Sequence, residues 1–332
     1  MLGVKLSIVI LCWNDLEVIN NCLRSIYAGT RSTEFEVIVS DNGSTDGSTG
    51  FIRETFPLVH IIENGTNLRF SKGNNVGIEA STGEYVLILN PDTVIPEGSL
   101  DRWIEFADRH PEAGGFGCRV LNLDGSYQGS ARPFPTIWRE WLAALCLGRL
   151  SYVSEVFVSD KYVRWKGNTE RLIDWHSGCC LMVRAKLLKD LGGFDDQFQY
   201  YYEDVDLCRR IWDAGHPIVY TPSVTITHLG GQSTMDRFPI AFELDKYRNR
   251  YRYFYKYFGR EGARGCRRYS LARIWVRQIG YRLICILRPS EGLKKRLELY
   301  RAASEWNMRV DPVQLVEEGK EPESCAQVPL QV

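Results

Sequence analysis

The sequence lacks the long hydrophobic runs of membrane-spanning helices. Its first apolar run, Leu6 to Cys12, is too short to cross a bilayer and has no small-residue cleavage site behind it, so we predict a strand and no signal peptide. Glycine fingerprints of the G-x-G-x-x-G or Walker type are absent, which counts against a dinucleotide-binding or P-loop enzyme. The ten cysteines form no repeated C-x-x-C pairs, and a reducing cytosol is the simplest compartment for them.

Net charge is also missing, because 41 basic and 41 acidic residues cancel. Their distribution is uneven, since the stretch 246–301 holds about seventeen lysines and arginines against about three glutamates. A chain of 332 residues with 44% hydrophobic residues can bury one large core, or one core and an appendage. Adjacent Cys179 and Cys180 lie in an apolar run, so we expect them to be buried in a strand and not to bind a metal.

Short apolar strands alternate with helical patterns through the first half of the chain, which predicts β-α-β units and a mainly parallel sheet. Predicted strands span 6–11, 36–39, 59–63, 85–89, 179–184 and 218–227, and predicted helices span 16–27, 48–55, 72–80, 97–109 and 205–214. We therefore expect an α/β domain over 1–235, with a nucleotide-type half over 1–120 and a substrate-facing half over 121–235. A helical basic extension over 236–310 and a disordered tail over 311–332 are expected to follow.

The apolar strand 85–89 stops abruptly at Asn90, Pro91 and Asp92. Ligands of open α/β sheets bind beyond the carboxyl ends of the strands, so Asp92 is predicted to lie in a crevice, where a carboxylate can hold a metal-bound diphosphate. Taken alone, Pro-Asp-Thr is more often a surface turn. The neighbouring segments favour the crevice.

A polar loop follows the second predicted strand and opens a helix. Asp41, at the strand end, can accept a hydrogen bond from the imide N–H of uracil or thymine, which indicates a pyrimidine nucleotide. Helix capping by Ser44 or Asp46 is the ordinary explanation of such a loop, but it does not account for Asp41. Further along, Arg69 and Lys72 are candidates for phosphate contacts, with an ordinary flexible loop as the alternative.

Glu203 and Asp204 form a second carboxylate cluster, beside the tyrosines 200–202 that can stack on sugar rings. A helix N-terminus should keep such a carboxylate ionised and lower its basicity, yet it can still take a proton from a hydroxyl under attack. Plain helix capping is the competing explanation. His228 precedes two glycines, and only proximity to Asp92 would make it a ligand for a hard divalent ion, because a lone histidine is more often structural.

Taken together, these motifs resemble the family 2 glycosyltransferases, and rhamnosyltransferase-like members in particular. The resemblance covers about residues 5–235 and rests on segments Leu6–Asn14, Asp41, Leu89–Asp92, Gly192–Asp195 and Glu203–Leu207. It implies the GT-A fold, a Rossmann-like nucleotide-binding sheet that is mixed at the acceptor side. It also implies inverting transfer of a sugar such as rhamnose from a dTDP- or UDP-linked donor to a glycan or lipid-linked acceptor, in cell-surface polysaccharide synthesis.

The resemblance implies roles for individual residues. Asp204 would be the catalytic base, with Glu203 beside it, while Asp92 and His228 would bind Mg²⁺ or Mn²⁺. Donor-binding residues would be Asn14, Asp41, Ser44, Arg69, Lys72, Asn74 and Asn90. Acceptor-binding residues would be Trp175, Ser177, Gly178 and Tyr202.

Two positions depart from the family pattern. The usual Asp-x-Asp is Asn90-Pro91-Asp92 here, and Arg69 stands where a glycine commonly precedes Phe70. Asn90 still offers a neutral oxygen, so we retain a divalent ion. The alternatives to an active transferase are a catalytically inactive nucleotide-sugar-binding relative, supported only by Asn90, and a dehydrogenase, which the missing glycine fingerprint opposes.

Tyrosines alternate with arginines and lysines over 247–258. This pattern favours docking of the stretch 246–301 on an anionic membrane surface, which would make a cytoplasmic protein peripheral to the inner face of the cell membrane. A helical bundle with a solvated basic face explains the pattern equally well. The stretch has no recognisable nucleic-acid module, so no nucleic-acid partner is expected.

Overall fold

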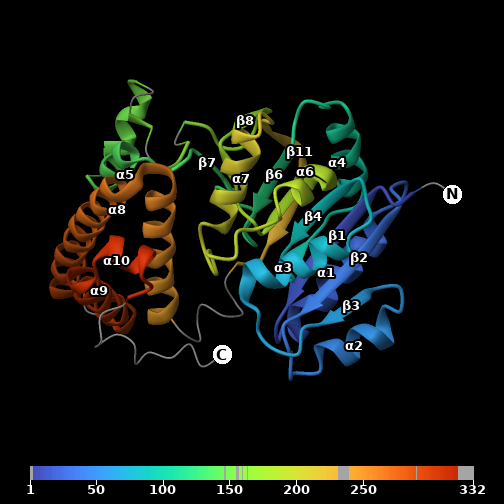
Figure 1. The fold of residues 1–332 in the computed structure, drawn as a ribbon, viewed down its shortest axis with the longest axis horizontal. Coiled ribbons are helices and arrows are strands. Elements are labelled where there is room, and N and C mark those ends of the chain that lie inside the picture. Colours follow the sequence, from blue (N-terminus) through green and yellow to red (C-terminus); the bar gives the residue numbers. More distant parts are fainter. Residues whose placement is uncertain are drawn as a thin grey trace. The chain divides into compact units, whose positions relative to one another are not determined.

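The computed structural model describes residues 3–145, 147–154, 157–158, 160–162, 164–230, 239–288 and 290–320. Contacts within the chain divide it into two units, the sheet unit and the helical unit (Figure 1). The sheet unit comprises Met1–Phe134, Trp165–Gln199 and Glu203–Ser233. The helical unit comprises Pro135–Arg164, Tyr200–Tyr202 and Thr234–Val332.

Among the described residues, nine strands form one sheet in the order β3-β2-β1-β4-β10-β6-β11-β5, with β8 beside β11. Their bounds are β1 (Leu6–Cys12), β2 (Phe35–Asp41), β3 (His60–Glu63), β4 (Tyr85–Leu89), β5 (Thr93–Val94), β6 (Gly115–Leu121), β8 (Arg171–Ile173), β10 (Cys180–Arg184) and β11 (Ile218–His228). Strands β1 to β4 pair in parallel, whereas β10 runs antiparallel between β4 and β6. The sheet is therefore parallel on the nucleotide side and mixed beyond β4, as predicted.

Five helices of the sheet unit agree with the predicted ones to within three residues at either end, and a sixth, α6, was not predicted. They are α1 (Leu16–Gly29), α2 (Ser48–Thr55), α3 (Arg69–Ala80), α4 (Ser99–Asp108), α6 (Ala185–Asp190) and α7 (Glu203–Asp213), and a short ladder joins β7 (Ala131–Arg132) to β9 (Trp175–His176). Helix α3 begins at Arg69, earlier than predicted, because Asn67 Oδ1 accepts a hydrogen bond from Arg69 N–H at 2.8 Å and supports the first turn. Helix α7 begins at Glu203, so both carboxylates of the second cluster lie in its first turn.

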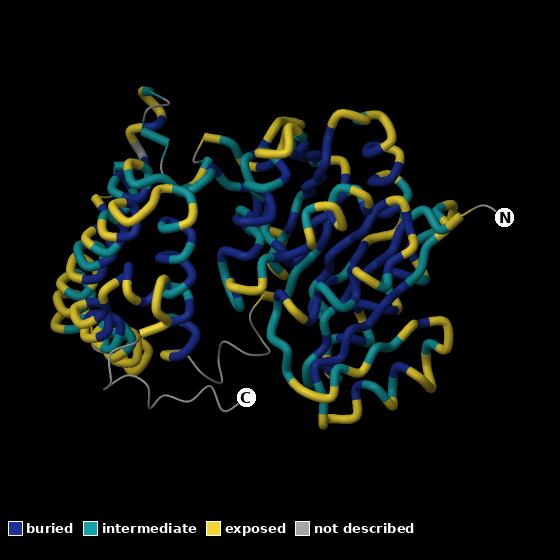
Figure 2. The backbone as a smooth tube through the Cα atoms, viewed as in Figure 1, coloured by how far each residue is buried: buried dark blue, intermediate teal, exposed yellow. Residues whose placement is uncertain are grey.

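The central strands are buried on both faces. Every residue of β4 is buried, and in β1 only Leu11 keeps partial exposure (Figure 2). Uninterrupted apolar runs of this kind suit the middle of a covered sheet. Two glycines let α3 lie close to β1, because a Cβ at Gly77 would collide with Val9 and a Cβ at Gly73 would collide with Leu11. Close packing therefore explains Gly73 better than loop flexibility does.

The helical unit is formed by α5 (Ile137–Ala144), the 3₁₀ helix η1 (Leu147–Tyr152), α8 (Pro239–Leu287), α9 (Glu291–Arg309) and α10 (Pro312–Glu317). Gly259 has φ 65° and ψ −165°, which divides α8 into two arms, 239–258 and 260–287. The arms pack as a hairpin, since the Arg250 guanidinium lies 5.4 Å from the centre of the Tyr269 ring. Helix α5 packs on the second arm, where the rings of Trp141 and Tyr269 are 6.2 Å apart, so the segment 135–164 belongs with the helices.

The structure bears on two expectations about this unit. Membrane docking and a helical bundle explained the tyrosines of 247–258 equally well, and the structure favours the bundle for them, because Tyr247, Tyr251 and Tyr253 are buried in the helical core and Tyr255 and Tyr257 are half-buried. Aromatic residues three or four positions apart suit a bundle core as well as an interface, so their spacing did not distinguish the two. The chain beyond 310 was expected to lack structure, yet Asp311 caps α10 by accepting a hydrogen bond from Val313 N–H at 2.8 Å. Residues 321–332 of that predicted tail lie outside the described residues.

Two sequence-level expectations about the whole chain also have outcomes. Cys179 and Cys180 are buried and free, as predicted, and burial raises the pKa of the Cys179 thiol to about 12. Within the described ranges, none of the helices combines the length and the apolar character needed to cross a bilayer.

Candidate active site

Asp41 lies at the carboxyl edge of the sheet, where β2 ends beside Cys12 of β1. Its Oδ2 accepts hydrogen bonds from the backbone N–H groups of Gly43 and Ser44, both at 3.0 Å. The other carboxylate oxygen, Oδ1, is buried and has no hydrogen-bond partner among the described residues. One oxygen thus holds the loop, and the second remains an acceptor suited to an N–H donor of a ligand.

Asn14 and Ser44, two of the predicted donor-binding residues, join neighbouring loops. Ser44 Oγ accepts a hydrogen bond from Asn14 N–H at 2.9 Å, and Asn14 Oδ1 accepts one from Thr45 N–H at 2.8 Å. Asp46 Oδ1 accepts a hydrogen bond at 3.0 Å from the backbone N–H of Ser48, the first residue of α2, so Asp46 and not Ser44 supports the start of this helix. Asn14 and Ser44 therefore shape the edge on which Asp41 lies.

Arg69 and Lys72 line one pocket of about 210 Å³ at the start of α3, together with Asn67, Ser71, Asp196 and Gln199. Arg69 has a φ of 65°, a left-handed conformation that glycine adopts more easily than arginine does. Asn74, predicted with them, is buried and donates to Phe70 O at 2.9 Å. The two cations thus share a hollow that could receive phosphate, whereas Asn74 belongs to the helix interior.

Asp92 and His228 lie together, as a metal site requires. Pairing of β5 with β11 sets His228 opposite Thr93, and Asp92 Oδ1 is 3.1 Å from His228 Nε2. The Asn90 amide nitrogen is 3.4 Å from the same ring nitrogen. Within the described part of the chain no group of three or more His, Cys, Asp or Glu side chains could hold a metal. Two ligands suit Mg²⁺ or Mn²⁺ when substrate phosphate and water supply the remainder.

The orientation of His228 is set by Gln128, a residue that sequence reasoning missed. Gln128 Oε1 lies 2.9 Å from His228 Nδ1, while Gln128 Nε2 donates to Asn122 Oδ1 at 3.0 Å. Asn122 in turn donates through Nδ2 to Ser126 Oγ at 2.8 Å, and the Ser126 hydroxyl donates to Asp124 Oδ1 at 2.6 Å. A carboxylate can only accept, so the direction of each bond follows from Asp124. Nδ1 of His228 therefore carries a proton, and Nε2 faces Asp92.

Asp204 is held by two backbone donors. Gly178 N–H donates to Oδ2 at 3.1 Å and Val205 N–H donates to Oδ1 at 2.8 Å. Burial nevertheless raises the pKa of Asp204, although these bonds and the charge of Arg132 act in the opposite direction. The net shift of the Asp204 pKa is therefore opposite to the one expected from the helix N-terminus, because desolvation of the charged form is the larger effect.

Glu203 is the more deeply buried member of the pair. Its Oε2 has no hydrogen-bond partner among the described residues, and burial together with the neighbouring Asp204 charge raises the pKa of Glu203 well above its ordinary value. Glu203 is therefore suited to remain protonated while Asp204 carries the charge.

The start of β10 connects the two acidic clusters. Strand β10 is antiparallel to β4, which puts Cys180 opposite Leu89. Just before this pair, Cys179 O accepts a hydrogen bond from Asn90 N–H at 2.9 Å, and Gly178 donates to Asp204. A Cβ at Gly178 would lie 3.4 Å from Asp204 Cβ, so glycine allows this approach. The Asp92 pair and Asp204 therefore lie at the same end of the sheet.

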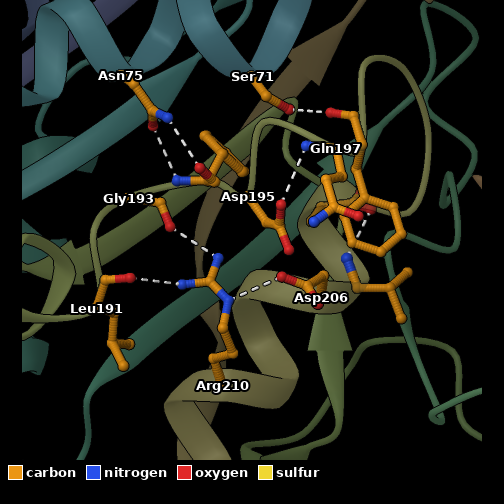
Figure 3. A network of polar contacts seen from close by, with 12 residues as sticks. Ser71, Asn75, Leu191, Gly193, Asp195, Gln197, Asp206 and Arg210 are labelled. Carbon is orange, nitrogen blue, oxygen red and sulfur yellow. Dashed lines mark hydrogen bonds and ion pairs between the residues drawn. The ribbon is translucent and has the colours of Figure 1, made fainter. Parts of the chain in front are cut away.

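A polar network fixes the segment that leads to α7 (Figure 3). Arg210 donates to Asp206 Oδ2 at 2.8 Å, to Leu191 O at 3.0 Å and to Gly193 O at 2.7 Å. On the side of α3, Asn75 Oδ1 accepts a hydrogen bond from Phe194 N–H at 2.8 Å, and Asn75 Nδ2 donates one to Phe194 O at 2.8 Å (Figure 3). The network ties α7 to α3 and so positions Asp204.

The predicted acceptor residues have different surroundings. Trp175 donates through Nε1 to Pro133 O at 2.9 Å, and the Arg132 guanidinium lies 5.7 Å from the centre of its indole ring. Ser177 N–H donates to Ser130 O at 2.9 Å, directly before Gly178. Tyr202 belongs to the helical unit, where it is buried and its hydroxyl oxygen accepts a hydrogen bond from Arg250 Nε at 2.8 Å.

Comparison with known proteins indicates the same family as the sequence motifs do. A sequence profile of glycosyl transferase family 2 matches residues 7–192. N-acetylglucosaminyl-diphospho-decaprenol L-rhamnosyltransferase of Mycobacterium tuberculosis is 34% identical over 209 residues, which cover 60% of this chain and 67% of that protein. Rhamnosyltransferase WbbL of Escherichia coli is 25% identical over 183 residues, which cover 52% of this chain and 65% of WbbL.

A solved structure gives the corresponding result for the fold. The mannosyltransferase PcManGT from Pyrobaculum calidifontis, in complex with GDP-Man and Mn²⁺, matches with a TM-score of 0.55 at 17% identity, over 92% of this chain and 87% of PcManGT. This likeness concerns the fold alone, and the predicted GT-A fold is confirmed.

Proposed function

Because the chain belongs to glycosyl transferase family 2, we propose that it is an inverting enzyme that moves a sugar from a nucleoside diphosphate donor to a hydroxyl group of a glycan or lipid-linked acceptor. The observation that carries the proposal is the meeting of the Asp92–His228 pair with Asp204 at the start of β10. The relatives that are rhamnosyltransferases favour rhamnose as the sugar and a polyprenyl-diphosphate-linked saccharide as the acceptor, in cell-surface polysaccharide synthesis.

Asp204 is the general base in this proposal. It would take the proton of the acceptor hydroxyl as the oxygen attacks the anomeric carbon, and the nucleoside diphosphate would leave from the opposite face. The raised pKa of Asp204 makes it a stronger base than an exposed aspartate, while its two backbone donors keep it in position. Mg²⁺ or Mn²⁺ held by Asp92 and His228 would neutralise charge on the departing diphosphate.

Asp41 is the residue proposed to recognise the nucleotide base of the donor. Its buried, unpartnered Oδ1 suits the imide N–H of uracil or thymine, so the donor would be UDP- or dTDP-linked. An asparagine at this position can keep an oxygen toward Gly43 and Ser44 and would then present an NH₂ group to the base. The variant Asp41→Asn should therefore lose affinity for UDP and dTDP and gain affinity for CDP, whose base has an acceptor at that position.

Calorimetric titration with dTDP-rhamnose and UDP-sugars, with and without Mn²⁺, tests the proposal. Wild type should bind one of these donors in a metal-dependent way, and Asp92→Ala should lose that dependence. Asp204→Asn should still bind the donor but transfer no sugar. Failure of wild type to bind any nucleotide sugar would refute the proposal, and binding without transfer to any saccharide or lipid-linked acceptor would favour the inactive relative.

A further inference from the structure

The second arm of α8 carries a stripe of exposed apolar side chains that no part of the proposed reaction uses. Trp275, Ile279, Leu283 and Leu287 follow one another at intervals of four residues and are 53%, 59%, 58% and 81% exposed. Val276 and Ile286 continue the same face. At 1.5 Å per residue the stripe is about 18 Å long. Soluble proteins seldom expose an uninterrupted apolar surface of this kind unless something binds there.

The opposite face of this arm is the one that packs within the helical unit. Gln278 Nε2 donates to Tyr300 O of α9 at 2.8 Å, and the rings of Tyr281 and Tyr300 stack with centres 5.6 Å apart. With 3.6 residues per turn, positions 278 and 281 are on nearly the same side of the helix, and the centre of the stripe is turned away from them by more than a right angle. The core of the bundle therefore does not account for the stripe.

Positive charge accompanies the stripe. From Gly262 to Ser290 the sequence contains seven arginines and no acidic residue. Exposed Arg268 precedes Trp275 on the same face, and exposed Arg282 is at the edge of the stripe. The surface that covers this face must therefore be apolar at its centre and negatively charged around it.

We propose that the stripe from Trp275 to Leu287 docks on an anionic lipid membrane, with the helix axis parallel to the bilayer. At about 100° per residue the four side chains spread over about 120° of the helix surface, which is one face that a flat surface can cover. The apolar side chains enter the acyl boundary, and Arg268 and Arg282 meet the headgroups. This assigns membrane contact to the second arm, because Tyr247, Tyr251 and Tyr253 of the first arm are buried. The inference is independent of the proposed reaction.

Flotation of the full chain with vesicles tests the proposal. Wild type should float with vesicles of phosphatidylcholine and phosphatidylglycerol, should float much less with pure phosphatidylcholine, and should be released by high salt. The double variant Ile279→Ser/Leu283→Ser should bind the anionic vesicles on the order of tenfold or more weakly, because two apolar side chains no longer leave water. The matched control Leu58→Ser/Leu123→Ser changes two leucines of the sheet unit that are 81% and 68% exposed, and it should bind like wild type.

Several outcomes would overturn the proposal. They are equal flotation of the two double variants, equal binding to neutral and anionic vesicles, and absence of binding by folded wild type. Formation of a dimer that the stripe variant alone abolishes, without vesicle binding, would assign the face to a second copy of the chain instead. Circular dichroism confirms that each variant is folded, and metal-dependent donor binding should be unchanged in both, which separates this test from that of the reaction.

Discussion

Replacing Gln128 with methionine removes the acceptor that orients His228 but nearly keeps the length of the side chain. The lost bond, 2.9 Å from Gln128 Oε1 to His228 Nδ1, contributes about 1 kcal/mol net in a typical case. The ring is then free to turn or to exchange its proton between nitrogens, so Nε2 no longer faces Asp92 in every molecule. Loss of such an orienting partner reduces metal affinity by about 10–100-fold, and we expect Gln128→Met to fall in that range for Mn²⁺.

The affinity is measured by electron paramagnetic resonance of Mn²⁺ in the presence of the nucleoside diphosphate. His228→Ala defines complete loss of the ligand, and His60→Ala, which changes an exposed histidine of β3, is the control that should bind like wild type. Nitrogen-15 spectra of the metal-free protein provide a second measurement, because Nδ1 of His228 should carry a proton in wild type and be protonated in fewer molecules of Gln128→Met. Unchanged Mn²⁺ affinity in Gln128→Met, together with weak binding by His228→Ala, would refute the orienting role.

Three further predictions concern the base, the donor loop and the packing of α3. Asp204→Asn should abolish transfer yet raise the melting temperature at pH 7. A carboxyl whose pKa is raised in the folded state stabilises the protein at low pH and loses that contribution as the pH rises, and asparagine does not ionise. Thermal melts at pH 4 should therefore show a smaller difference between the variant and wild type. Arg69→Gly should relieve a left-handed backbone by about 1 kcal/mol and raise the melting temperature, while calorimetry should show weaker donor binding; unchanged binding would dismiss the phosphate role. Gly77→Ala should destabilise the protein by about 1–3 kcal/mol in urea unfolding because its Cβ would collide with Val9, whereas Gly50→Ala in α2, which has open space around it, should not.

Much of the fold followed from patterns that the chain shows directly. Apolar runs separated by helical patterns predicted the parallel half, and the end of each run placed Asp41 and Asp92 at one edge. The pairing of Asp92 with His228 was predicted only as a condition, since the sequence does not reveal that β11 returns beside β5. Strand order in the mixed half depends on contacts between distant segments, which periodicity does not encode.

Other features had no local signal. Gln128 is a single polar residue in an irregular stretch, and only the chain of bonds through Asn122 to Asp124 reveals its function. The tyrosines of the first α8 arm have a spacing that serves a buried core or an interface equally, and the packing of the hairpin decides between them.

Asp204 shows why the chemistry of a site is harder to predict than its location. Its position at the first turn of α7 favours the charged form, and so do the N–H groups of Gly178 and Val205. Each of these effects can be inferred from a helix start, but the desolvation that outweighs them comes from elements distant in sequence, including the start of β10. Burial raises the proton affinity of Asp204 while the two donors hold its orientation, and Glu203, whose pKa is raised further, leaves Asp204 as the carrier of the charge. We therefore expect Asp204 to reduce the stability of the fold at neutral pH and, as the proposed base, to have a proton affinity better matched to a sugar hydroxyl under attack.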